Sequence, residues 1–108
     1  MLTVTFSKNS DGIYYEVRIE GHAEYAEMGQ DIVCAGISAL FLNTATSIVE
    51  LTPDEVELWQ EEENEISGFR IISSTISDEA VLLMDSLILG LNGIADEYGD
   101  KYIVIIYR

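Results

Sequence analysis

Alternating apolar and polar residues open the chain and predict a β-hairpin. Apolar side chains fall at every second position in residues 2–6 and again in residues 13–19, which is the spacing of strands buried on one face. Residues 9–12, Asn-Ser-Asp-Gly, join the two runs and are typical of a turn. The predicted core positions of the hairpin are Leu2, Val4, Phe6, Ile13, Tyr15, Val17 and Ile19.

A long amphipathic helix is predicted after a loop at residues 21–30. Asp31 is a favourable N-cap residue, and the apolar positions after it have helical spacing. Pro53 ends this helix, because proline disfavours the helical conformation of the residue before it. The stripe expected to face the core comprises Val33, Ile37, Leu40, Phe41, Thr44, Ile48 and Leu51.

Two more strands, a second helix and a last strand are predicted in the second half of the chain. Residues 56–60 and 66–73 are strand-like segments on either side of an acidic turn. Ser77 is the expected N-cap of a helix with an acidic first turn, and Gly99 is its expected C-terminal stop. Residues 102–107 are apolar on both faces, which predicts a strand in the middle of a sheet.

The predicted order of elements is therefore ββαββαβ over residues 1–108, a length that fits one domain. Five strands and two long helices predict a two-layer α+β fold, in which the helices pack on a mostly antiparallel sheet. The order of the strands within the sheet does not follow from the pattern.

Charge and cysteine content narrow the class of protein. The chain has 20 acidic and 5 basic residues, and its net charge of −15 would repel nucleic acid and anionic membrane surfaces. A single cysteine cannot form an intramolecular disulfide, and one cysteine with one histidine is too few for a structural zinc site. The longest nearly apolar run, residues 33–42, is too short to span a bilayer. We therefore expect a soluble cytoplasmic domain with no metal, cofactor, nucleic-acid partner or membrane partner.

The only cysteine and the only histidine are the candidates for chemistry. With Asp31 as N-cap, Cys34 lies in the first helical turn, where unpaired N–H groups and the helix dipole favour a thiolate. His22 precedes it by twelve residues, and the glycine-containing loop between them can fold back so that imidazole and thiol meet. Ser38 is one turn further along the same helix face. Together these residues form a candidate Cys–His dyad.

Simpler structural roles stay open for the same residues. A single cysteine in an apolar run is most often a buried small hydrophobic residue, and a histidine after a strand is most often a boundary residue. Asp31 is most simply a helix cap, and Ser38 a small residue between helix and sheet. The acidic residues 61–65 are expected to form a solvated turn.

Residues 21–38 carry a more specific signal than the isolated dyad. Their sequence, GHAEYAEMGQDIVCAGIS, closely resembles the pattern G-H-A-x-Y/F-A/G-x-x-G-x-D-I/V-V/I-C-A/S-A/G-x-S of the bacterial ribosomal-processing cysteine proteases, the Prp family. Residues 68–69, 87–91 and 102–103 also look like the family. One departure is Glu24, which stands where the family commonly has glycine.

The resemblance implies an activity and assigns roles to residues. In the family, the cysteine at the helix start is the nucleophile and the histidine of the Gly-His pair is its base, which implies Cys34 and His22 here. The family removes the N-terminal extension of large-subunit ribosomal protein number twenty-seven, just after an apolar segment that contains phenylalanine. Its members are homodimers of an α+β subunit. The resemblance therefore implies a single cysteine-protease domain, residues 1–108, that acts on a ribosomal-protein extension as a cytoplasmic homodimer.

Four further residues are expected to support such a dyad. Backbone N–H groups around Val33 and Cys34 are expected to donate to the oxyanion of the intermediate. Gly21 would let the backbone approach closely, and Ser38 would bond near the thiol or line the substrate groove. Asp31 would either cap the helix or orient the imidazole. Two non-catalytic functions remain alternatives: an acidic module that binds a basic protein, and an assembly factor that holds a ribosomal protein without cutting it.

Overall fold

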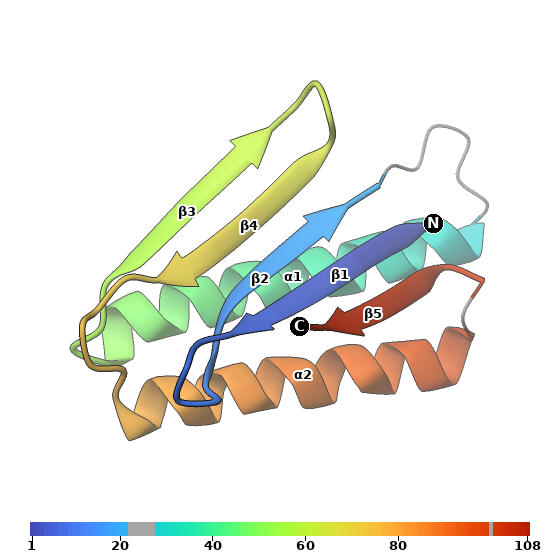
Figure 1. The fold of residues 1–108 in the computed structure, drawn as a ribbon. Coiled ribbons are helices and arrows are strands. Elements are labelled where there is room, and N and C mark those ends of the chain that lie inside the picture. The colour runs from blue at the N-terminus through green and yellow to red at the C-terminus, as the bar shows by residue number, and fades with distance from the viewer. Residues whose placement is uncertain (22–27, 100) are drawn as a thin grey trace.

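The computed structural model describes residues 1–21, 28–99 and 101–108, and these form five strands and two helices (Figure 1). In chain order the elements are β1 (Leu2–Lys8), β2 (Tyr14–Glu20), α1 (Met28–Leu51), β3 (Val56–Glu61), β4 (Ile66–Ile71), α2 (Asp78–Tyr98) and β5 (Ile103–Tyr107). The predicted ββαββαβ order is confirmed. His22 and Glu24 lie outside the described residues.

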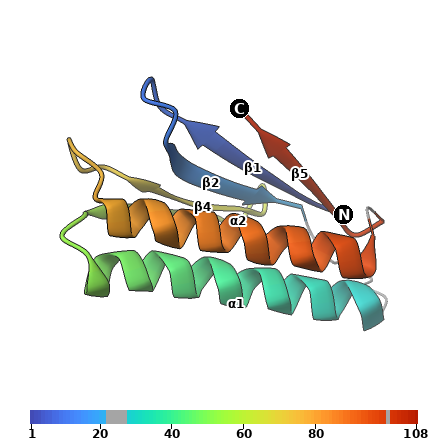
Figure 2. The ribbon, with the colours of Figure 1, turned by 90° about the horizontal axis from the view of Figure 1, so that it is seen from below.

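The five strands form one mixed sheet in the order β3-β4-β2-β1-β5. The pairs β1–β2, β2–β4 and β3–β4 are antiparallel, and β1–β5 is parallel. Figure 2 shows that α1 and α2 run side by side and cover the same face of this sheet. The predicted two-layer α+β fold with a mostly antiparallel sheet is therefore confirmed.

The hydrophobic core lies between the helix layer and the covered face of the sheet. The strands contribute alternate residues, as the period of a strand requires, and the helices contribute residues three or four positions apart. Its fully buried large side chains are Val4, Phe6, Val17, Val33, Ile37, Ile48, Phe69, Met84, Leu87, Leu91 and Ile103. The helix predicted from residue 31 therefore buries much of the stripe that its periodicity indicated.

The core face of β2 departs from the predicted alternation at its first residues. Ser7 pairs with Glu16, whereas Lys8 pairs with Tyr14, so Tyr15 is an extra residue in a β-bulge. Tyr14 consequently packs against the core in place of the predicted Tyr15, with its ring centroid 6.2 Å from that of Phe6. A bulge shifts the alternation of core-facing residues by one position. A prediction that assumes strict alternation therefore assigns the wrong tyrosine to the core.

The last strand is at an edge of the sheet, so its predicted central position is wrong. β5 pairs only with β1, its single neighbour in the sheet. Ile103 and Ile105 join the core, whereas Val104 and Ile106 are half-buried on the other face. Apolar residues on both faces of a strand therefore indicate that both faces are covered. They do not indicate whether the strand lies at the edge or in the middle of the sheet.

A buried carboxylate joins the end of α1 and the start of β3 to the start of α2. Asp54 is buried, and its side chain accepts hydrogen bonds from the backbone N–H of Ser77 at 3.2 Å and from the Ser77 hydroxyl. The Ser77 hydroxyl oxygen also accepts from the N–H of Ala80, as an N-cap does, so the predicted cap is confirmed. Burial raises the pKa of Asp54, but the hydrogen bonds from Ser77, Ser73 and Thr52 outweigh it, so the pKa lies below 3.8.

We expect Asp54→Asn to lower the free energy of unfolding by about 1–2 kcal/mol at neutral pH, because charge-assisted hydrogen bonds to the α2 cap are lost. A carboxyl with a lowered folded-state pKa stabilises the fold above its unfolded pKa and loses this effect as the pH falls through the folded pKa. The difference between wild type and variant should therefore shrink below about pH 4. Urea unfolding at several pH values measures it, and a difference that does not change with pH would contradict this role.

Candidate active site

A cavity of about 370 Å³ lies where the ends of β1 and β2 meet α1 and the β3–β4 turn. The residues that line it come from four parts of the chain that are distant in sequence. They are Leu2, Ile19, Gly21, Cys34, Ile37, Ser38, Gln60, Glu61, Glu62, Glu65, Ile66 and Ser67. The cavity therefore contains three of the residues expected at the site: Gly21, Cys34 and Ser38.

Cys34 lines this cavity and is not fully buried in the core. Cys34 is of intermediate exposure, and its buried side packs against the hydrophobic core. Ile37 and Ser38 lie one helical turn further along α1 and line the same cavity. Cys34 therefore borders this cavity from a helix that is anchored in the core.

Gly21 occupies a backbone position that no other residue fits without strain. Its φ is +124°, and a Cβ added there would lie 2.3 Å from the carbonyl oxygen of Met1. Its N–H donates to the carbonyl oxygen of Glu65 at 3.3 Å. The residue immediately before His22 is therefore held against β1 on one side and the β3–β4 turn on the other.

The start of α1 differs from the prediction. The helix begins at Met28, so Asp31 belongs to its first turn and is not the N-cap. Cys34 is then the seventh helical residue, beyond the first turn where the helix dipole acts most strongly. An acidic residue is favourable both at the cap and within the first turn, so the pattern could not distinguish the two positions.

The same shift removes the oxyanion donors predicted from the sequence. In a helix that begins at Met28, the N–H groups of Val33 and Cys34 face the carbonyls of residues 29 and 30. The side chain of Val33 is 1% exposed and belongs to the core. Val33 is therefore a packing residue, and it is not among the residues that line the cavity.

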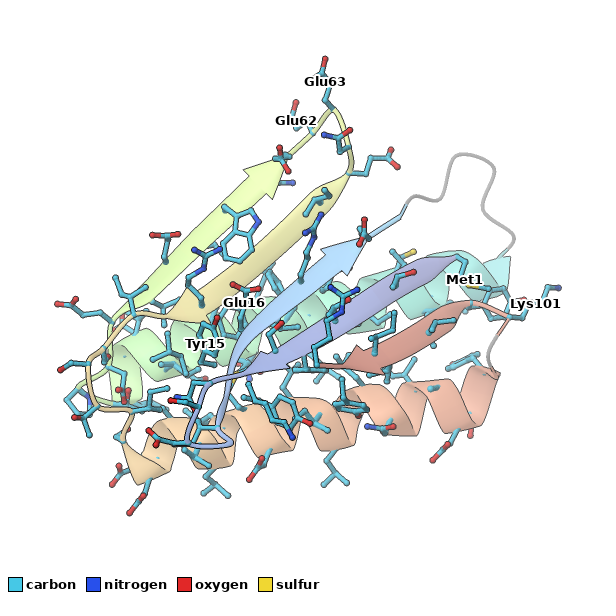
Figure 3. The ribbon with its side chains drawn as sticks, viewed as in Figure 1. Met1, Tyr15, Glu16, Glu62, Glu63 and Lys101 are labelled. Atoms are coloured by element: carbon cyan, nitrogen blue, oxygen red, sulfur yellow. The ribbon has the colours of Figure 1, made fainter. Side chains whose placement is uncertain are left out.

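The β3–β4 turn supplies the wall of the cavity that sequence analysis missed. Glu61, Glu62 and Glu65 line it, and Figure 3 shows Glu62 and Glu63 at the tip of the turn. These residues were expected to form a solvated turn, and they are exposed, but they also face the helix that carries the thiol. Only the strand order brings residues 61–65 near residue 34, so no local signal could have identified them.

A stacked cluster on the uncovered face of the sheet fixes this wall against β2. The indole of Trp59 lies directly over Gly68, where a Cβ would come within 2.3 Å of the ring. The Arg70 guanidinium stacks 4.6 Å from the Trp59 centroid, and its Nε lies 3.0 Å from a carboxylate oxygen of Glu16 on β2. The three neighbouring strands β3, β4 and β2 are thus tied together by side chains as well as by the backbone.

A second cavity, of about 330 Å³, continues from the first between α1 and β3. Both cavities are lined by Ile19, Ser38, Gln60 and Ser67, so they form one groove. The second part is more apolar and is completed by Phe41, Leu42, Leu58 and Trp59. An extended chain lying in this groove would meet acidic residues beside the thiol and apolar residues further along.

The described residues place no metal site beside the thiol. Among residues 1–21, 28–99 and 101–108, no group of three or more His, Cys, Asp or Glu side chains could hold a metal ion.

Comparison with known proteins identifies relatives along almost the whole chain. The family model of cysteine protease Prp matches residues 1–103. The ribosomal processing cysteine protease Prp of Staphylococcus aureus is 32% identical over 101 residues, which are 94% of each chain. The crystal structure of a ribosomal processing protease Prp from S. aureus with a substrate peptide matches with a TM-score of 0.88 and 30% identity. The structure with a covalently linked product peptide matches with a TM-score of 0.85 and 31% identity, and both alignments cover 100% of each chain.

We expect Gly21→Ala to lower the free energy of unfolding by about 2 kcal/mol or more, because the new Cβ meets the Met1 carbonyl at a strained φ. Gly12→Ala is the matched control, since Gly12 has a φ of +80° but no atom within 4 Å of the added Cβ, and it should cost only about 1 kcal/mol. Urea unfolding compares the two variants. Equal losses would show that the contact with β1 has no role beyond the backbone angle.

Proposed function

The chain belongs to the family of cysteine protease Prp, and we propose that it removes the N-terminal extension of large-subunit ribosomal protein number twenty-seven by means of a Cys34–His22 dyad. The observation that carries this proposal is the position of the single thiol. Cys34 lines a cavity together with Gly21, the residue directly before the only histidine of the chain. The alignment with a protease that holds a covalently linked product peptide supports the same assignment.

The proposed reaction is acyl transfer through a thioester. His22 accepts the proton of the Cys34 thiol, and the sulfur attacks the carbonyl carbon of the scissile peptide bond. The C–N bond breaks as the imidazolium returns the proton to the leaving amine. Water then attacks the thioester, releases the new carboxyl end of the extension and regenerates the thiol. Ser38 lines the groove one turn from Cys34, which supports the proposal that its side chain contacts the peptide next to the reacting carbonyl.

The two parts of the groove match the two chemical features of the proposed substrate. The apolar part, with Phe41 and Leu58, suits the phenylalanine-containing segment that precedes the cut in substrates of the family. The acidic part, with Glu61 and Glu65, suits the basic character of a ribosomal protein. Because such a substrate is made and assembled in the cytoplasm, we place the enzyme there as well, and we expect the homodimer that the resemblance implies.

We expect Cys34→Ala and His22→Ala each to reduce cleavage of a peptide carrying the extension by about three orders of magnitude or more. Cys34→Ser keeps the shape of the site and should be almost as inactive, because a hydroxyl is a weaker nucleophile beside the same base. Product formation measured by mass spectrometry gives the rates. Ser38→Ala is the control that leaves the dyad intact, and it should lower the rate far less. Unchanged turnover by Cys34→Ala would overturn the proposal.

The same variants separate the enzyme from the non-catalytic alternatives. An assembly factor or an acidic binding module would bind the peptide equally well as wild type and as Cys34→Ala, and neither protein would release product. A protease binds in both forms and releases product only as wild type. Peptide binding followed by fluorescence anisotropy, beside product analysis on the same samples, therefore distinguishes the two classes.

The acidic residues of the groove should make the rate of cleavage depend on salt concentration. We expect kcat/KM for a lysine-rich peptide to fall as salt rises from 0.02 to 0.5 M, since screening shortens the reach of the carboxylates to about 4 Å. Combined replacement of Glu61, Glu62 and Glu65 by Gln should lower kcat/KM by about three- to tenfold at low salt and flatten its salt dependence. Glu55→Gln/Glu79→Gln/Asp85→Asn removes the same charge away from the groove and is the control. Equal effects of the two triple variants would show that the groove has no special role in attracting the substrate.

A further inference from the structure

Glu65 has a backbone conformation that glutamate rarely adopts. Among the described residues it is the only one other than glycine with a positive φ, which is +51°. It is the last residue of the β3–β4 turn, and its N–H donates to the carbonyl oxygen of Glu62 at 3.3 Å. Glycine or asparagine is favoured at such a turn position, because both tolerate the left-handed region at little cost. A glutamate that is strained there and also lines a cavity points to a function for its side chain.

The backbone of Glu65 is hydrogen-bonded to the residue directly before the only histidine. Glu20 on β2 pairs with Ile66 on β4, so Gly21 and Glu65 are neighbours across the two strands. The N–H of Gly21 donates to the carbonyl oxygen of Glu65 at 3.3 Å. His22 is the next residue along the chain, and consecutive Cα atoms are about 3.8 Å apart. A carboxylate at position 65 can therefore reach an imidazole at position 22.

The cavity that contains Cys34 favours a positive charge. The described residues that line it include the carboxylates of Glu61, Glu62 and Glu65, and they include no Lys or Arg. A cation forms here when a thiol transfers its proton to an imidazole. A carboxylate beside the imidazole stabilises that cation and holds the ring in one orientation, whereas a carboxylate beside the sulfur opposes the thiolate. The position of each carboxylate relative to the two groups therefore decides its effect.

We propose that Glu65 is a positioning residue of the Cys34–His22 dyad. Its carbonyl oxygen holds the N–H of Gly21, and its carboxylate accepts a hydrogen bond from the imidazole of His22. One residue of the turn thus holds both the backbone before the base and the ring of the base. Glu65 acts on the reaction through His22. The inference rests on the proposed function, because it assigns a partner to the base of the dyad.

Other titratable groups lie on the elements around this end of the sheet. Gly21 has a single N–H, and its acceptor is Glu65, which distinguishes this residue from the other carboxylates. Glu20 lies 3.9 Å from Nε of Arg18 on the uncovered face of the sheet. The remaining groups are the α-amino group of Met1 before β1, Asp31 and Cys34 on α1, and Glu61 and Glu62 at the β3–β4 turn.

The single histidine makes the test direct, because an NMR titration of its carbon-bound ring protons follows one imidazole. The titration is made in the Cys34→Ala background, which removes the thiol as a second titrating group. We expect Glu65→Gln to move the midpoint to lower pH by about half a pH unit at low salt, since an exposed carboxylate that stabilises the imidazolium is lost. Glu63→Gln removes the same charge from the tip of the same turn and should leave the midpoint almost unchanged (Figure 3).

Glu65→Gly separates the side chain from the backbone. Glycine adopts the left-handed conformation without strain, so the turn and its hydrogen bond to Gly21 should remain, and thermal unfolding should not occur at a lower temperature. We expect this variant to move the imidazole midpoint as far as Glu65→Gln does. An unchanged midpoint would show that residue 65 acts only through the turn. A shift produced by Asp31→Asn and not by Glu65→Gln would overturn the proposal in favour of Asp31.

Peptide cleavage gives a second measurement, in the protein with its thiol. We expect Glu65→Gln to lower kcat about threefold with little change in KM, because half a pH unit of imidazole stabilisation corresponds to about that factor. A loss confined to KM would show that Glu65 attracts the substrate and does not position the base. An inactive wild type would contradict the proposed function, whereas equal midpoints for Glu65→Gln and Glu63→Gln would contradict the role of Glu65 even in an active protease. The two failures are therefore distinguishable.

Discussion

A mismatch in width between the two layers underlies the groove on which the candidate active site depends. Two helices side by side cover about 20 Å, whereas five strands span about 24 Å. The part of the sheet that the helices leave uncovered lies along β3. Leu58 of β3 pairs with the core residue Phe69 and points to the same face, yet it is 56% exposed. The surface of β3 that a wider helix layer would bury therefore stays accessible. It forms one wall of the groove that begins at Cys34.

Helix α1 meets three different demands with residues on different sides of the helix. Ile37 and Ile48 bury one side in the core, and Cys34 and Ser38 face the groove. A third side, with Ile32 and Val49, faces solvent. The core anchors the helix as a rigid element, which holds the thiol in a defined position relative to Gly21. Leu42 is 53% exposed and also lines the apolar part of the groove, so a substitution on the solvent side of the helix can alter the groove directly.

Local chemistry predicted those features that depend on neighbouring residues. The cap at Ser77, the C-terminal stop at Gly99 and the alternation in β1 were all recognised, because each follows from contacts within about four residues. The predicted positions were wrong where two local backbone conformations have similar free energies. Asp31 suits a cap and a first turn equally well, and a bulge at Tyr15 moves Tyr14 into the core at little cost to the ladder.

The sequence by itself determined the fold class, the family and the candidate nucleophile. Periodicity and helix caps indicate the elements, and the motif at residues 21–38 indicates the family and Cys34, and all of these are local patterns. Only the tertiary structure decided that β5 lies at an edge, that residues 61–65 form a wall of the cavity, and that Cys34 and Gly21 share that cavity. The reason is physical. Strand order brings together residues tens of positions apart, and the free energy of those contacts depends on the packing of the whole domain, so no single segment carries the information.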